Sequence, residues 1–238
     1  MRSKSTHSEH FAGLPAFSSP VPAKATLRPP LQKRSADAQR RMVRAGLRLL
    51  ESQGIDQISV RDISREAGTS IGSFYHRFQT KEQFFTFLLD DMIVRREAAA
   101  VRELADQSIS IDALPETLAR AAMNNFRHHA GLLRSAIRCH IGGDRCWDPI
   151  NLMAMRIVNG YLRRLSDSLG RPLASQERAR IRFAFVWLYG LLLHRTLRLN
   201  VIHGYVVPDK VFEEEMIRNF RQLIDRAISQ SKPVGAKK

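Results

Sequence analysis

Apolar side chains recur at helical spacing along most of the chain, and no stretch shows the sustained alternation of a half-buried strand. From Ser35 onward this pattern predicts helices at about residues 36–53, 60–67, 71–77, 81–104, 112–129, 131–140, 149–169, 176–199 and 209–229. Glycine and proline residues separate these segments. The predicted fold class is therefore all-α.

Charge divides the chain into regions of different character. The 238 residues carry a net charge of +15, and 44% are hydrophobic, which is enough for a packed core. Residues 1–34 contribute +5, residues 35–81 +3, residues 82–231 +4 and residues 232–238 +3. We therefore predict a disordered basic tail, a polyanion-binding module, a larger helical body and a short basic C-terminal tail, in that order. The simplest polyanion is nucleic acid.

The sequence offers little sign of export, membrane insertion or metal binding. No stretch reaches the roughly 20 apolar residues of a membrane span, and the N-terminus lacks the apolar core of a signal peptide. We expect a cytoplasmic protein without a membrane partner, a cofactor or a metal. Cys139, His140 and Cys146 do not have the spacing of a structural zinc site. Buried or free thiols are the favoured interpretation of the two cysteines, and a redox switch between them is the alternative.

Residues 59–84 have the pattern of a helix-turn-helix. Ser59 and Asp62 are placed to form a capping box at the start of a short helix, which should stop at Gly68. Ser70 should then cap a second short helix. Two short helices joined by a tight turn that contains glycine are typical of a helix-turn-helix.

The second short helix is predicted to have one apolar and one polar side. The residues expected to face the core are Ile71, Phe74 and Phe78. The residues expected to project outward are Gly72, Ser73, His76 and Arg77, with Tyr75 at the border. A short, polar and mildly basic exposed face is what a helix entering the major groove of DNA needs.

Further basic residues flank this motif. Arg40, Arg41, Arg44 and Arg48 share one side of the first helix. This side is either a solvated basic face or a face near a phosphate backbone. Lys81 lies in the first turn of the long helix that follows, capped by Thr80. We favour a phosphate contact for Lys81 over a solvated lysine, because the helix N-terminus also attracts anions.

Residues 38–84 resemble the DNA-binding domain of the TetR family of bacterial transcriptional regulators. The resemblance rests on AGLRLLESQGIDQISVRDISREAG followed by TSIGSFYHRFQTKEQF. It implies a dimeric protein whose varied all-α body binds a ligand. The implied roles are phosphate contacts for Tyr75 and Lys81 and base or backbone contacts for Ser73 and His76. The predicted DNA-binding residues are Arg44, Arg61, Thr69, Ser70, Gly72, Ser73, Tyr75, His76, Arg77 and Lys81.

One position departs from the family pattern. The family often has lysine where this chain has Ile71, and the change removes one phosphate contact. Base preference therefore cannot be carried over from other members.

The last two predicted helices have the strongest apolar character. FAFVWLYGLLL, residues 183–193, is apolar nearly all round and should be buried on nearly all sides. The final helix carries a stripe formed by Phe212, Met216, Phe220, Leu223 and Ala227, with Ile217 and Ile224 beside it. We favour a four-helix interface between two subunits over burial within one subunit, because paired recognition helices read half-sites about 34 Å apart.

The middle helices are predicted to enclose an effector pocket. The candidate lining residues are Met123, Phe126, His129, Leu133, Ile137, Trp147, Met155, Tyr161, Phe185, Trp187 and Tyr189. Their apolar, aromatic and methionine character favours a small hydrophobic effector. For each residue taken singly, ordinary core packing is the stronger interpretation.

The function implied is a dimeric, sequence-specific repressor of transcription that a small hydrophobic effector releases from double-stranded DNA. The alternative is an effector-independent activator or nucleoid-associated protein. An enzyme is not expected, because the sequence has no glycine-rich phosphate loop, GxSxG, HExxH or plausible carboxylate pair. The tail of residues 1–34 should add non-specific, salt-dependent affinity for DNA.

Overall fold

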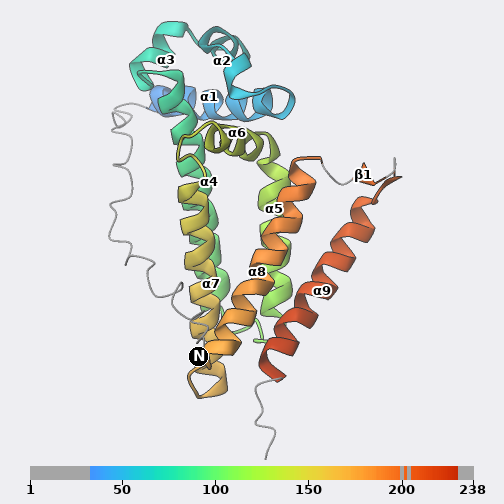
Figure 1. Ribbon diagram of the computed structural model, residues 1–238. Coiled ribbons are helices and arrows are strands. Elements are labelled where there is room, and N and C mark those ends of the chain that lie inside the picture. Colours follow the sequence, from blue (N-terminus) through green and yellow to red (C-terminus); the bar gives the residue numbers. More distant parts are fainter. Residues whose placement is uncertain (1–32, 199–200, 203–204, 230–238) are drawn as a thin grey trace, which may run out of the picture.

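The computed structural model describes residues 33–198, 201–202 and 205–229, which are almost entirely helical (Figure 1). The helices are α1 (Lys33–Ser52), α2 (Val60–Glu66), α3 (Ile71–Arg77), α4 (Lys81–Ala105), α5 (Leu114–His128), α6 (Ala130–Ile141), α7 (Asp148–Leu169), α8 (Ser175–Thr196) and α9 (Asp209–Ser229). Every predicted helix is present, with ends within three residues of those expected. The all-α fold class is confirmed.

Three short elements were not predicted. A 3-10 turn, η1 (Ile55–Gln57), links α1 to α2. Strands β1 (Val201–Ile202) and β2 (Tyr205–Val206) pair antiparallel between α8 and α9. Two-residue strands are too short to show an alternating pattern in the sequence.

The two predicted tails fall largely outside the described residues. Residues 232–238 and residues 1–32 are among those that the structure does not describe. The last two positions of the predicted N-terminal tail, Lys33 and Arg34, instead form the start of α1.

Local side-chain bonds set the start of α2 and α3 as the sequence predicts. Ser59 Oγ accepts a hydrogen bond from Asp62 N at 3.1 Å, and the Asp62 carboxylate accepts one from Ser59 N, also at 3.1 Å. Gly68, with φ of +59°, provides the left-handed backbone that turns the chain out of α2. Ser70 Oγ then accepts from Ser73 N at 3.1 Å and caps α3.

A cluster of phenylalanines holds α3 against α4. The rings of Phe74, Phe78 and Phe84 are fully buried, and their centroids are 4.9 to 5.4 Å apart. Such edge-on and tilted contacts stabilise a core beyond simple burial of area. The cluster fixes which side of α3 faces inward, so the opposite side of α3 is turned to solvent.

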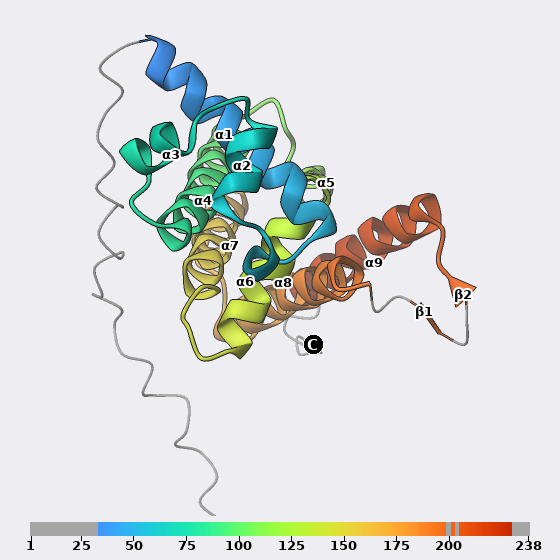
Figure 2. The ribbon, with the colours of Figure 1, turned by 90° about the horizontal axis from the view of Figure 1, so that it is seen from above.

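The body is a bundle that hangs below the α1–α3 domain (Figure 1). The long helix α4 begins in that domain and continues down the body, where α7 packs along it. Helix α8 packs against α9, and α5 contacts both of them. Viewed from above, β1 and β2 project to one side, at the end of α9 (Figure 2). The predicted domain boundary at residues 81–82 lies in the first turn of α4, so one continuous helix crosses it.

Besides α4, helix α6 also supports the α1–α3 domain, because it packs against α1. Gly131 N donates a hydrogen bond to Glu51 Oε1 at 3.1 Å, and Arg134 Nη2 donates to Glu51 O at 2.8 Å. The backbones approach so closely that a Cβ on Gly131 would lie 2.1 Å from Leu50 O. A pocket of about 300 Å³ opens beside this contact, between the end of α1, α6 and the end of α8.

A partly buried histidine at the α5–α6 corner makes stability depend on pH. Burial lowers the pKa of His129 below 6.5, and the neighbouring His128 acts in the same direction. In the described part of the chain, His129 Nδ1 is buried without a hydrogen-bond partner. Folding therefore favours the neutral imidazole.

We expect the His129→Gln variant to lose part of the acid sensitivity of the wild type. Between the lowered pKa and 6.5 the unfolded chain binds more protons than the folded one, so the free energy of unfolding falls as pH falls through this window. Chemical denaturation from about pH 7.5 down to about pH 5.5 measures the slope. His194→Gln is the control, because that side chain is exposed and is not among the groups that shift the pKa of His129. Equal slopes in the wild type and His129→Gln would contradict the prediction.

Candidate nucleic-acid interface

The outward side of α3 presents a compact polar surface. Ser70, Gly72, Ser73 and His76 are exposed, and Tyr75 is 52% exposed. The hydroxyl oxygens of Ser70 and Ser73 lie 2.9 Å apart, within hydrogen-bond distance. The predicted orientation of this face is confirmed: polar groups point outward while Phe74 and Phe78 anchor the helix behind them.

Two residues of α3 differ from the prediction. Ile71, expected in the core, is 44% exposed at the first position of the helix. Arg77, expected to project outward, is only 7% exposed, and its guanidinium donates a hydrogen bond to Ser35 Oγ in α1. Both residues lie at the ends of a seven-residue helix, where the adjoining turn and the start of α1 decide the direction of a side chain more than the helical period does.

The basic face of α1 is partly used for internal contacts. Arg41 Nε donates to Ala67 O at 3.1 Å and so holds the end of α2. Arg48 pairs with Glu66 at 2.8 Å, and Arg40 pairs with Asp37. Arg44 is exposed and makes no hydrogen bond or ion pair with any other described residue. Of the four arginines, Arg44 is thus the one whose whole guanidinium is left for an external partner by the described residues.

The residues that flank the helix-turn-helix differ in exposure and in their hydrogen bonds. Arg61 is exposed in the first turn of α2, whereas Thr69 is half-buried and its N–H donates to Ser64 O at 2.9 Å. The Lys81 ammonium is half-buried and donates to Ile55 O in η1 at 2.9 Å. An ammonium has three donors, so this bond leaves two for a phosphate.

The predicted effector residues are distributed through the core and do not surround a described pocket. Met123, Phe126, Leu133 and Tyr161 are buried, and His129, Trp147 and Trp187 are half-buried. The secondary candidates Phe185, Tyr189 and Ile137 are likewise buried or half-buried. Met155 is 48% exposed on the surface of α7, which is incompatible with a place inside the body. Burial raises the pKa of Tyr189 to about 12 and also raises that of Tyr161, so both phenols stay neutral.

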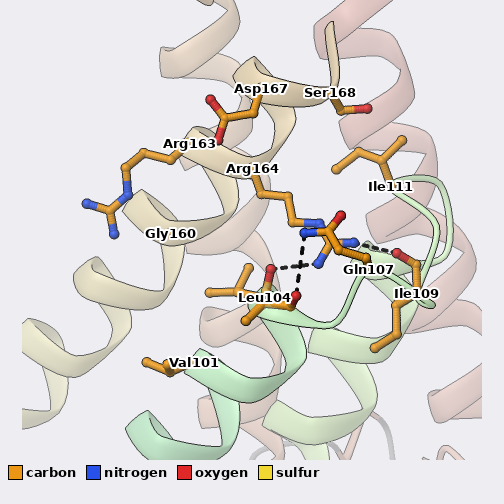
Figure 3. Close-up of a pocket in the computed structure, with 11 residues that line it drawn as sticks. Val101, Leu104, Gln107, Ile109, Ile111, Gly160, Arg163, Arg164, Asp167 and Ser168 are labelled. Carbon is orange, nitrogen blue, oxygen red and sulfur yellow. Dashed lines mark hydrogen bonds between the residues drawn. The ribbon is translucent and has the colours of Figure 1, made fainter. Parts of the chain in front are cut away.

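A larger cavity of about 610 Å³ lies at the end of the body remote from α1–α3 (Figure 3). It opens between the last turns of α4, the α4–α5 connection and the second half of α7. The Arg164 guanidinium donates to Leu104 O, Asp106 O and Ile109 O at 2.5 to 2.7 Å and holds the connection in place. The lining is mixed, with the apolar Val101, Leu104, Ile109 and Ile111 beside the polar Gln107, Arg163, Asp167 and Ser168.

This cavity was missed by sequence reasoning. Its shape depends on the hydrogen bonds from Arg164 to three backbone carbonyl groups at the α4–α5 connection. A periodic pattern of apolar residues does not predict such bonds. The only sequence signal was a break in the helical pattern between residues 104 and 112.

The cysteines are joined in the structure. Cys139 near the end of α6 and Cys146 before α7 form a disulfide, with Cα atoms 6.0 Å apart. The favoured interpretation as buried or free thiols is therefore wrong. The turn at Gly142 and Gly143, where Gly143 has φ of +105°, brings the two residues together.

No helix among the residues that the structure describes is long and apolar enough to cross a membrane. Within residues 33–198, 201–202 and 205–229, no group of three or more histidine, cysteine, aspartate or glutamate side chains is placed to hold a metal ion.

Helix α8 has a buried face and an exposed apolar face on opposite sides. Phe183 and Val186 are 61% and 68% exposed, and Gly190 continues the same row. The apolar stripe of α9, by contrast, is used within the chain: Met216, Phe220, Ile224 and Ala227 are fully buried, partly against α8. The intrasubunit alternative thus holds for the α9 stripe, whereas α8 keeps an exposed apolar side in the single chain.

Comparisons with known proteins agree with this geometry. Residues 43–86 match the family model for bacterial regulatory proteins of the tetR family. A segment of 53 residues is 42% identical to the uncharacterised HTH-type transcriptional regulator YwcC of Bacillus subtilis. That match spans 22% of this chain and 24% of the relative.

Solved structures share the fold over most of the chain. A candidate TetR-family transcriptional regulator from Mesorhizobium loti superposes with a TM-score of 0.61 at 16% identity, covering 84% of this chain and 98% of its own. A transcriptional regulator from Cytophaga hutchinsonii gives 0.56 at 16% identity, covering 82% and 95%. GusR of Salmonella enterica gives 0.54 at 14% identity, covering 79% and 95%.

The match of residues 43–86 coincides with α1–α3 and the start of α4, where the outward polar face of α3 lies. The N-terminal helix-turn-helix domain of this chain is therefore similar to that of the tetR family of bacterial regulatory proteins.

Proposed function

We propose that this protein is a cytoplasmic, sequence-specific DNA-binding regulator that places α3 in the major groove. The observation that carries the proposal is the exposed polar face of α3, held outward by the buried rings of Phe74 and Phe78. The proposed DNA-binding residues are Arg44, Arg61, Thr69, Ser70, Gly72, Ser73, Tyr75, His76 and Lys81. Arg77 is left out, because it is buried against α1.

We further propose that two copies pair through the exposed face of α8. Ala179, Phe183, Val186 and Gly190 follow one another at steps of four, three and four residues, so they form one stripe along the helix. Gly190 has no atom within 4 Å of the position of a Cβ, which leaves room for close approach of a second helix. A self-complementary stripe suits a two-fold axis, and two recognition helices suit a palindromic site.

Regulation by a small molecule is proposed at the 610 Å³ cavity rather than among the aromatic residues of the core. Its volume lies within the usual range for ligand sites. The mixed lining favours an amphipathic effector over a purely hydrophobic one. Because α4 borders the cavity and also carries Phe84, movement of α4 would reposition α3. Effector binding would then favour a dimer geometry that no longer fits its operator, as in a repressor.

The proposed function is tested by selecting genomic DNA fragments with the purified protein at physiological salt. We expect enrichment of a palindromic sequence and its protection in a footprint. Fragments enriched without any common sequence would support a nucleoid-associated role instead, and no retained fragment at all would refute DNA binding.

The Ile71→Lys variant should bind DNA more tightly and with less selectivity. The exposed side chain at the start of α3 lies beside the proposed phosphate contacts, so a lysine there adds one cation. Because the proposed dimer carries two copies of this lysine, we expect the slope of log K against log salt to steepen by about 1.8. Titration of operator and unrelated DNA at several salt concentrations measures this slope. Ile71→Gln is the uncharged control, and an unchanged slope in Ile71→Lys would place this position away from the backbone.

The Ser168→Trp variant should bind DNA normally and lose its response to an effector. Ser168 lines the cavity and is exposed, so an indole there fills the space without disturbing the core. Leu169→Trp is the matched control, because that neighbouring residue is also exposed but does not line the cavity. Compounds that release the wild type from its operator are applied to both variants. Equal release of Ser168→Trp and the control would rule out this cavity.

A further inference from the structure

Cys139 and Cys146 lie where α6, which packs on α1, is followed by α7, which packs along α4. Cys139 is in the last turn of α6, and Cys146 comes two residues before α7. Their proximity does not depend on the disulfide alone. Asp144 N donates to Cys139 O at 3.2 Å, and the His140 ring lies 3.1 Å from Asp144 O. These contacts shape the turn that brings Cys146 back towards Cys139, and the disulfide adds a covalent link between α6 and the residues before α7.

The cellular compartment of the protein indicates whether this disulfide is structural or transient. A protein that works on DNA in the cytoplasm is in a reducing compartment, where disulfides are usually transient and serve catalysis or redox sensing. Both cysteines are only half-buried, and the loop between them, residues 141–145, is exposed. A small oxidant can therefore reach the sulfur atoms.

We propose that Cys139 and Cys146 form a reversible peroxide-sensing site that alters DNA binding. This inference rests on the proposed function. Asp144 Oδ2 lies 3.8 Å from Cys139 Sγ, and a carboxylate beside a sulfur disfavours its thiolate, so we assign the first attack to Cys146. The Cys146 thiolate attacks one peroxide oxygen, the O–O bond breaks, and a sulfenic acid forms, while the departing hydroxide takes up the proton released by the Cys146 thiol and leaves as water. The Cys139 sulfur then displaces the sulfenic oxygen, which leaves as a second water with the Cys139 proton.

The two thiols are oxidised by two electrons in this sequence, and one hydrogen peroxide is reduced to two waters. A cellular dithiol reverses the reaction by thiol–disulfide exchange and is itself oxidised to a disulfide.

The disulfide reaches the DNA-binding domain through two packed paths. Helix α6 holds α1 through Gly131, Arg134 and Glu51. Helix α7 holds α4 along its length, with Arg156 Nη1 at 2.8 Å from Glu97 Oε1, and α4 carries the phenylalanine cluster under α3. The disulfide between α6 and the start of α7 therefore fixes the helix that holds α1 relative to the helix that holds α4. Reduction lets α6 shift, and the orientation of α3 shifts with it.

The test compares the full-length protein after hydrogen peroxide with the same protein after a phosphine reductant. We expect the oxidised wild type to lose two hydrogen atoms in intact mass and to differ at least about fivefold from the reduced form in operator affinity. Cys139→Ser and Cys146→Ser are expected to show neither change while remaining folded. Hydrogen exchange at the Gly131 amide is measured in parallel, and reduction should accelerate it.

Two results would overturn the inference: failure of peroxide to form the intramolecular disulfide, or a disulfide that leaves the affinity for a bound operator unchanged. Absence of DNA binding in both redox forms would instead refute the proposed function. In that case the mass change and the exchange rate still decide whether the site senses peroxide and moves α6.

Discussion

Replacing Gly131 with alanine is expected to lower the free energy of unfolding by about 1–3 kcal/mol, the usual cost of forcing extra volume into a packed contact. A Cβ at this position would lie 2.1 Å from Leu50 O and 2.3 Å from Leu50 C. Both are backbone atoms in α1, which cannot rotate away as the end of a side chain can. The added methyl group must therefore push α6 away from α1.

The separation should also weaken polar contacts at the joint. Gly131 N and Arg134 Nη2 both donate to Glu51, and both bonds lengthen if α6 moves outward. The gain in helix propensity from glycine to alanine, up to about 1 kcal/mol, opposes the loss and does not cancel it. Urea denaturation measures the change in unfolding free energy, and hydrogen exchange in α1 locates it.

Gly72→Ala provides the matched control for this effect. It makes the same change within a helix, but the added Cβ meets only Ser70 Oγ at 3.8 Å, an ordinary contact. We therefore expect equal or slightly greater stability for this variant. If Gly131→Ala proved as stable as Gly72→Ala, the close packing of α6 on α1 would be refuted.

The local features of the fold follow from short stretches of sequence. Helix ends were predictable because capping uses residues within one turn, as the mutual bonds between Ser59 and Asp62 show. The anchoring role of Phe74 and Phe78 was predictable for the same reason, since two large apolar groups four residues apart mark one side of a helix.

Features that depend on partners distant in sequence were not predictable. Arg77 is buried because α1 begins beside it, and that contact spans 42 residues. The stripe of α9 showed that the helix is amphipathic but not whether α8 of the same chain or a second chain would cover it. The disulfide could not be predicted without knowing that the glycine turn between α6 and α7 brings the two cysteines together.

Replacing Val186 with glutamate is expected to separate the proposed dimer and to reduce operator affinity at least about 100-fold, or about 2.8 kcal/mol. The side chain is 68% exposed in the single chain, so the substitution should leave the fold intact. In a pairing through α8 the same position lies within the stripe formed with Phe183 and Gly190. A carboxylate buried there without a partner opposes association. One subunit alone then contacts only one half-site.

Val94→Glu is the control for a new surface charge, because Val94 is also an exposed valine on a helix. It lies on α4 and is 63% exposed. Sedimentation gives the oligomeric state of both variants and of the wild type, and titration of a palindromic operator gives the affinity. We expect a monomer for Val186→Glu and a dimer for the other two. A dimeric Val186→Glu with wild-type affinity would show that α8 does not form the interface, since a buried carboxylate on the two-fold axis repels its own copy.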